Sequence, residues 1–422
     1  MSFQQGLSGL NAASKNLEII GNNVANAATY GAKSSRAEFA DVYANALNGS
    51  GSNTVGIGVN LAAVAQQFTQ GNISTTDNPM DLSINGSGFF QVSDGRNPTM
   101  YTRNGQFKID RDGFIVNNQR QQLLGYPADS QGTIVPGQAQ AIQLPTAGIN
   151  PRATDEIAIE MNLDVRSAVT LPTAPAARID LTDPTTYNNA TSVTVYDATG
   201  QDVALTYYFQ KTAADTWDVY VTANGAPVSV DGAGVPTPTT TMQFATNGSA
   251  PLSPAGPVTL NIPATTGTSG GTTLPIAGIQ LDLTNATQYG AGFGVTDLTQ
   301  TGYAPGQLSG ISIEGNGIIM ARYSNGQSRP AGQIELANFR NPQGLQPLGG
   351  NAWARTYTSG DPVVGAAGDG NFGSLQSGAL EESNIDLTGE LVNMITAQRT
   401  YQANAQTIKT QDQVLQTLVN LR

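Results

Sequence analysis

The chain of 422 residues contains no cysteine and no histidine. Without a thiol or an imidazole it cannot form a disulfide, a cysteine nucleophile, a Ser-His-Asp triad or a Cys/His zinc site. No stretch reaches the ~18 consecutive apolar residues that are typical of a transmembrane helix. These absences exclude several common catalytic, metal-binding and membrane-spanning arrangements.

Positive charge is also scarce, since 19 Lys and Arg residues face 31 Asp and Glu residues, for a net charge of −12. An acidic surface repels phosphate backbones and anionic lipid headgroups, so we expect no nucleic-acid partner and no membrane insertion. The first residues, MSFQQGLSGLNAASKNLEII, lack the basic region and the continuous apolar run of a secretion signal. We therefore expect the protein to stay in the cytoplasm, or to leave the cell by a route that cleaves nothing.

What the sequence does have is two helical ends around a β-rich middle. Apolar residues recur about every 3.5 residues at each end, which places them on one side of a helix. The stripes comprise Phe3, Leu7, Leu10, Leu17, Ile20 and Val24, and then Leu391, Met394, Tyr401, Ile408, Leu415 and Val419. Each stripe needs a partner, either the other end or the ends of neighbouring molecules. Because the remainder of each helix is polar, we favour an assembly seam over the alternative of a globular core.

The predicted fold class is mainly β with terminal α-helical coiled-coil segments, in a nested multidomain architecture that places both termini in one helical domain. Short alternating strands and glycine-containing turns, as in IDRDGFIV, indicate the β regions. Ser383 or Asp386 is expected to cap the last helix. The expected divisions are 1–30 with 383–422 as the helical assembly domain, 31–70 as an extended connecting segment, 71–145 with 303–376 as an inner β domain, and 146–302 as an inserted outer β domain.

Three patterns suggest chemistry, and each has a plainer explanation. GDGNFG, from Gly368 to Gly373, has dinucleotide-binding spacing but lacks the flanking strand and helix, so we predict a loop. DRDG, at 110–113, lacks the later ligands of a calcium loop, so we predict a hairpin turn. Acid pairs could serve a glycosidase, but nothing singles out Asp77 with Asp81 or Asp180 with Asp183. We predict no enzyme, no cofactor and no metal site.

Three blocks carry a resemblance to a known family, and they keep the family's order and spacing. They are LSGLNAASKNLEIIGNNVANAATYGAK at 7–33, QGNISTTDNPMDLSINGSGFFQV with YTRNGQFKIDRDGFIV at 70–92 and 101–116, and SGALEESNIDLTGELVNMITAQRTYQANAQTIKTQDQVLQTLVNLR at 377–422. The chain resembles the axial proteins of the bacterial flagellum, which are the rod, hook and hook-associated proteins. The long insertion at about 146–302 makes hook proteins the most similar members. One departure is that Tyr30 precedes Gly31 instead of following it.

This resemblance implies a structural subunit that polymerises into the flagellar hook, a flexible tubular universal joint that transmits motor torque from rod to filament. The implied partners are further copies of the chain, the rod and hook–filament junction proteins, the hook cap and the flagellar export apparatus. The implied location is the extracellular flagellum, at the hook and basal body, reached by type III export without a cleaved signal peptide. A distal rod protein and a secreted β-rich adhesin or binding protein remain alternatives.

Overall fold

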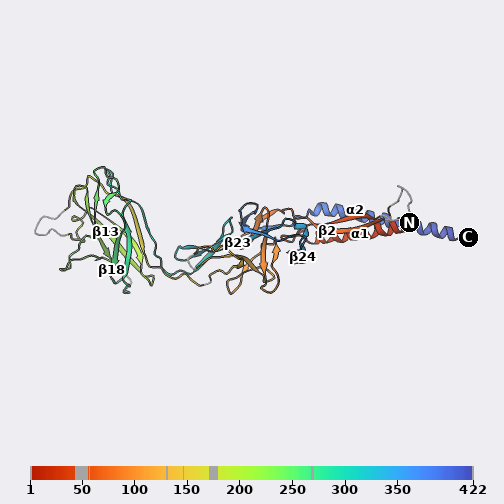
Figure 1. Cartoon of the computed structure of the whole chain (residues 1–422), viewed down its shortest axis with the longest axis horizontal. Helices are drawn as coiled ribbons and strands as arrows, with labels where there is room; N and C mark the ends of the chain where they lie inside the picture. Colours follow the sequence, from red (N-terminus) through yellow and green to blue (C-terminus); the bar gives the residue numbers. More distant parts are fainter. Residues whose placement is uncertain are drawn as a thin grey trace. The chain divides into compact units, whose positions relative to one another are not determined.

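The computed structural model describes residues 2–42, 56, 58–129, 132–145, 147–170, 179–267 and 270–420. Helix α1 (Ser2–Ala25) opens the chain and helix α2 (Leu387–Asn420) closes it, and the two pack together. The described residues between them form strands, loops and one 3-10 turn, η1 (Pro342–Gly344) (Figure 1). The predicted mainly-β fold class with paired terminal helices is therefore confirmed.

The chain divides into two compact units. The first unit comprises Met1–Thr146, Gly310–Arg322 and Ser328–Arg422, and the second comprises Ala147–Ser309 and Tyr323–Gln327. The second unit is thus inserted into the first, in the nested manner that the sequence indicates.

The first unit is built on a twelve-stranded sheet whose main path runs β21-β22-β23-β9-β5-β6-β25-β24. Its core forms because β4 and β5 bury nearly every side chain, and Leu82, Phe90 and Leu123 are fully buried. Its strands are β1 (Ser35–Val42), β2 (Gly58–Gln66), β3 (Ile73–Thr75), β4 (Leu82–Asn85), β5 (Phe89–Ser93), β6 (Met100–Thr102), β7 (Lys108–Ile109), β8 (Ile115–Val116), β9 (Gln122–Pro127), β10 (Gln140–Ala141), β21 (Leu308–Ile313), β22 (Ile318–Tyr323), β23 (Ser328–Asn338), β24 (Gln346–Gly349), β25 (Ala352–Ala354), β26 (Val363–Ala366), β27 (Ser374–Ser377) and β28 (Ala379–Glu381), of which β21 and β22 each cross the boundary between the units.

The second unit consists of two sheets around a shared apolar core. One sheet follows the order β12-β13-β14-β16-β17 and the other the order β18-β19-β11-β20. Along β13, Val203, Leu205 and Tyr207 are fully buried and alternate with more exposed neighbours, as predicted. The strands are β11 (Glu156–Asn162), β12 (Asn189–Tyr196), β13 (Asp202–Ala213), β14 (Thr216–Ala223), β15 (Ala226–Pro227), β16 (Thr240–Phe244), β17 (Pro251–Ser253), β18 (Val258–Ile262), β19 (Ile276–Asp282) and β20 (Gly294–Gln300).

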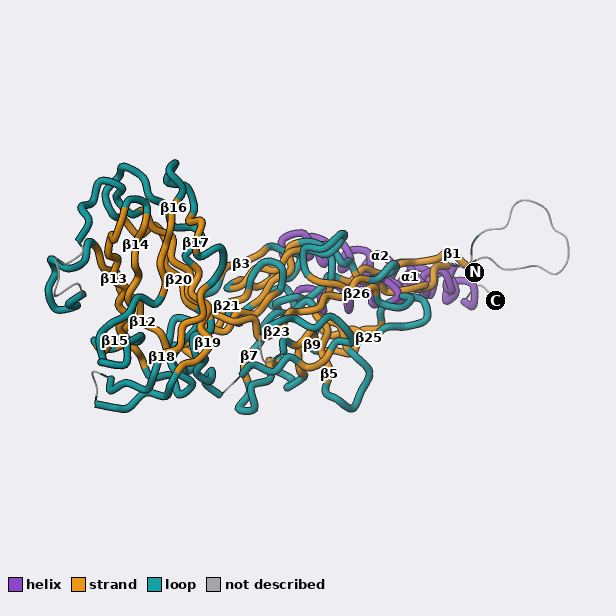
Figure 2. Tube along the Cα trace, turned by 60° about the vertical axis from the view of Figure 1, so that its left-hand side comes forward, coloured by secondary structure: helices purple, strands orange, loops and turns teal. Residues whose placement is uncertain are grey.

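The predicted extended connection at 31–70 is wrong where the structure describes it. Strands β1 and β2 pair antiparallel, with Ser35 opposite Gln66, and they lie beside α1 (Figure 2). The Ser8 hydroxyl accepts a hydrogen bond from the Val59 amide at 3.1 Å, which fixes the hairpin on the helix. The sequence hides these strands because only one face is covered, so their apolar alternation is weak. The remainder of the prediction, at 43–55 and 57, lies outside the described residues.

Both glycine-containing motifs are loops, as predicted. The DRDG segment turns between β7 and β8, where the Gly113 amide donates to the Asp110 carbonyl at 2.9 Å and Gly113 has a φ of 86°. The GDGNFG segment lies between β26 and β27, and the Gly368 amide donates to the Gly373 carbonyl at 3.1 Å. Neither helix in the described ranges is both long and apolar enough to cross a bilayer.

Candidate assembly interface

Helices α1 and α2 pair in antiparallel fashion. The Asn23 amide donates to Glu390 Oε1 at 2.9 Å near one end of the pair. Further along, a methyl group added at Gly9 would lie 2.9 Å from Asn404 Oδ1, and one added at Gly6 would lie 3.1 Å from Ile408 Cγ1. Residue numbers therefore rise along α1 as they fall along α2.

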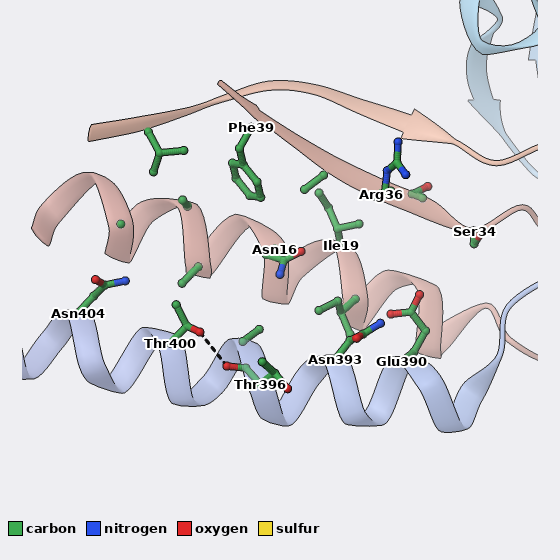
Figure 3. Close-up of a pocket in the computed structure, with 18 of the residues that line it drawn as sticks. Asn16, Ile19, Ser34, Arg36, Phe39, Glu390, Asn393, Thr396, Thr400 and Asn404 are labelled. Carbon is green, nitrogen blue, oxygen red and sulfur yellow. Dashed lines mark hydrogen bonds between the residues drawn. The ribbon is translucent and has the colours of Figure 1, made fainter. Parts of the chain in front are cut away.

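The surfaces that the two helices turn toward each other carry small and polar residues. From α1 these are Gly6, Gly9, Ala13, Asn16, Ile20 and Asn23, and from α2 they are Glu390, Asn393, Ala397, Thr400, Asn404 and Ile408. Figure 3 shows Asn393, Thr400 and Asn404 rising from α2 toward α1. Glycine and alanine allow the backbones to approach closely. We call this set the inner seam.

The apolar stripes that the sequence singles out mostly lie one residue later than the inner seam. Leu10 and Leu17 follow Gly9 and Asn16, and Leu391 follows Glu390. One residue corresponds to a rotation of about 100° around a helix. The apolar stripes therefore occupy a different side of each helix from the inner seam.

The structure places the twelve predicted seam residues in four groups. Leu7, Leu391, Tyr401 and Leu415 are between 37% and 54% exposed, whereas Leu10, Leu17, Val24, Met394 and Ile408 are half-buried and Ile20 is buried. Phe3 and Val419 are helical, but their side chains lie outside the description. Ile20 and Ile408 belong to the inner seam. The predicted assembly role of the whole set is untested and stays a prediction.

The β1–β2 hairpin adds a third wall beside the helix pair. Together α1, α2 and the hairpin enclose a groove of about 680 Å³. Its larger apolar side chains are Ile19, Ile20, Phe39 and Val59, and Ala12 and Ala37 are among its small residues. In Figure 3, Phe39 points from the hairpin toward α1.

At the base of the helix pair, three charged residues form a buried cluster. Lys33 Nζ lies 2.5 Å from Glu381 Oε1, and Arg103 Nη1 lies 3.0 Å from Glu381 Oε2. The three side chains are at most 6% exposed. Burial lowers the pKa of Lys33 and of Arg103, although the attraction to Glu381 opposes that change. We call these three residues the ion cluster.

The ion cluster ties together three distant parts of the chain. Lys33 also donates to the Thr69 carbonyl at 2.8 Å, and Glu381 Oε1 accepts from the Gly71 amide at 3.0 Å. Sequence reasoning missed this cluster because charged residues are expected at the surface. A signal existed, since Lys33, Arg103 and Glu381 each fall in a different one of the three family-like blocks.

Cap geometry and the acid pairs have simple structural roles. Asp386 precedes α2 and accepts from the Thr388 amide at 3.0 Å, so it is the predicted cap.

Among the candidate acid pairs, Asp81 accepts a hydrogen bond from the Thr76 hydroxyl at 2.9 Å. The Thr182 hydroxyl and amide hold the pKa of Asp180 below its usual range. Among the described residues, no group of three or more acidic side chains converges as a metal site would require.

Comparisons with known proteins agree with this architecture. A family model described as the "Flagella basal body rod protein" matches residues 3–33, and one described as the "Flagellar basal body rod FlgEFG protein C-terminal" matches residues 376–421. Between them, the "Flagellar basal body protein FlaE D2 domain" matches residues 128–303. The matched ends contain α1 and α2, which places the chain in the class of flagellar rod and hook proteins.

Full-length relatives identify the family more closely. The flagellar hook proteins FlgE of Salmonella typhimurium strain LT2 and Escherichia coli K12 are 44% and 42% identical over 425 residues, covering 100% of both chains. That of Rhizobium meliloti is 32% identical and covers 100% of this chain and 98% of its own length. The crystal structure of Helicobacter pylori FlgE2 shares the fold, with a TM-score of 0.53 and 15% identity over 73% of this chain and 100% of its own. The chain belongs to the flagellar hook protein family and is a structural component of the flagellum.

Proposed function

We propose that this chain polymerises into the flagellar hook through its paired terminal helices. The observation that carries this proposal is that most of the large apolar side chains of α2 stay exposed although α1 and α2 are already paired. On α2, Leu391, Val392 and Ile395 are each about half exposed. Burying one such side chain contributes roughly 1.5–3 kcal/mol. Several such contacts per subunit would hold a durable tube.

The wider role follows from family membership and from the division of the chain. The hook would act as a flexible joint between rod and filament, with the helices in its wall and the β domains outside. The proposed divisions remain 1–30 with 383–422, 71–145 with 303–376, and 146–302, and the two compact units support the last of these. The β surfaces would carry the bending, because polar surfaces can slide without exposing apolar area.

The proposed partners are further copies of the chain, the rod and hook–filament junction proteins, the hook cap and the export apparatus. The proposed route is type III export to the extracellular hook and basal body without a cleaved signal. We propose no enzyme activity. The support for this last point is that Asp180 and Asp183 accept hydrogen bonds from the threonines two residues later, as turn caps do.

A charge placed in the apolar stripe tests the proposal. Leu391→Asp should block tube formation, because an unpaired charge would be buried at each contact between subunits. Since Leu391 is 46% exposed in the single chain, the unfolding transition of the monomer should barely move. Electron microscopy of the assembled protein gives the readout. Asp183→Ala, in the second unit, is the matched control and should form normal tubes. Normal tubes from Leu391→Asp would contradict the proposal.

A further inference from the structure

The helix pair is unequal in length, which leaves one end of α2 extending beyond α1. Gly9 lies opposite Asn404, and Asn23 opposite Glu390. In that register Ser2, the first residue of α1, lies opposite Gln411. Helix α2 nevertheless continues to Asn420. Figure 1 shows its C-terminal part running on past the start of α1. We call residues 412–420 the overhang.

The overhang exposes two neighbouring large apolar side chains among polar ones. Val414 and Leu415 are each 54% exposed. Covering these two side chains with another apolar surface would be favourable, because it removes apolar area from water. The helix is continuous and directs the overhang away from its own groove. The groove of the same chain therefore cannot supply that surface.

The same chain also carries a surface that lacks a cover, namely the groove between α1, α2 and the hairpin. The groove follows α1 from Gly9 to Ile20, a length of about 16 Å at 1.5 Å per residue. The nine residues of the overhang span about 14 Å on the same measure. Ile19 and Phe39 offer apolar contacts, while Gly9, Ala12 and Ala37 leave room for a helix to approach.

From this match of length and polarity we propose that the overhang of one copy occupies the groove of a second copy. The inference rests on the proposed function and specifies which segment of one subunit meets which surface of the next. Val414 and Leu415 would face Ile19 and Phe39. The occupant is thus another molecule of this chain, and the joint repeats from one subunit to the next.

The absence of native cysteine permits a direct crosslinking test. Leu415→Cys and Ala37→Cys are introduced together, and the polymer is exposed to a mild oxidant. Asn23 bonds to Ser35 at the base of the pair, so Ala37 lies near that base and Leu415 lies beyond the opposite end. Their separation within one chain is about 30 Å by helix and strand rise. Because a disulfide requires Cα atoms within about 7 Å, any bond between them joins two chains.

The expected result is a ladder of crosslinked dimers and longer oligomers on a non-reducing gel. Each single-cysteine variant, and the pair Leu415→Cys with Asp183→Cys, should give no ladder. Tubes of normal appearance that yield no ladder from the double variant would overturn the groove assignment and leave the proposed function standing. If the unsubstituted chain formed no tubes, the proposed function itself would fail.

A second variant keeps the test decisive if the cysteine pair impairs assembly. Ala37→Trp fills the groove, and it should reduce tube formation while the monomer keeps its circular dichroism spectrum. Lys15→Trp is the matched control, because the Lys15 side chain is 56% exposed and is not part of the groove lining. Assembly of Ala37→Trp at the level of Lys15→Trp would refute the inference.

Discussion

The second unit and the helix pair use apolar residues in opposite ways. In the second unit, Tyr207, Phe209 and Trp217 are all fully buried inside a two-sheet core. In the helix pair, the inner seam is mostly small or polar, and most of the large apolar side chains of α2 are exposed. The first region contains the partners that stabilise it. The second region leaves apolar side chains exposed, and under the proposed function neighbouring subunits would cover them.

The largest expected effect comes from removing α2, since this separates assembly from folding. A chain ending at Asp386 keeps Glu381 and thus the ion cluster, but it loses every α2 contact. We expect no tubes by electron microscopy and an intact β signal by circular dichroism. Tubes from the shortened chain would show that the helices are dispensable, and loss of the β signal would show that they support the core.

Breaking the ion cluster tests whether the base of the helix pair has stability of its own. Glu381→Ala leaves Lys33 and Arg103 buried without their counterion, which costs about 3–5 kcal/mol. The matched control is Asp361→Ala, which removes the exposed ion pair with Arg355 and should cost no more than about 1 kcal/mol. Denaturant unfolding followed by the helical signal compares the two. Equal losses of unfolding free energy in the two variants would mean that the ion cluster stabilises the protein no more than an exposed ion pair does.

Truncating one apolar side chain in each region sharpens the comparison. Phe209→Ala should destabilise the second unit by about 3–5 kcal/mol, because it opens a cavity in a closed core. Leu391→Ala should change the free energy of unfolding of the monomer by less than about 0.5 kcal/mol, because the side chain is already exposed.

The two tryptophans separate these signals, since Trp217 lies in the second unit and Trp353 in the first. Fluorescence of Phe209→Ala in a Trp353→Phe background reports the second unit alone. A loss below about 1 kcal/mol there would contradict a tightly packed core.

The smallest effect concerns the Tyr207 hydroxyl, which has no hydrogen-bond partner among the described residues. Tyr207→Phe should raise the stability of the second unit by about 1 kcal/mol, because a buried unpaired hydroxyl is removed.

The contribution of Tyr207 to the free energy of unfolding should fall as the pH rises. Burial raises the pKa of Tyr207, whereas the unfolded side chain ionises near pH 10. Above that pH the unfolded chain releases the proton first, so the free energy of unfolding falls as pH rises. The fall between pH 9 and 11 should be shallower in Tyr207→Phe. Parallel curves for the two proteins would disprove this contribution.

The sequence predicted the helices, the β regions and several turns because those features leave local periodic signals. Asp386 is a cap of the expected type, and Val203, Leu205 and Tyr207 alternate as a half-buried strand should. The inner seam could not be predicted in this way. Gly9, Asn16 and Ala397 carry no apolar signal, so the heptad analysis found the neighbouring stripe one residue away. The contact between Lys33 and Glu381 spans 348 residues, and no local pattern reports such a pairing.

Insertion of the second unit into the first has a mechanical consequence. The chain enters the second unit after Thr146 and returns to the first at Gly310, so two covalent crossings connect the units at these points. A second excursion, at Tyr323–Gln327, adds another pair of crossings. A load applied to the second unit is therefore shared among several backbone strands acting in parallel. A domain attached at the end of a chain would carry the same load through a single tether.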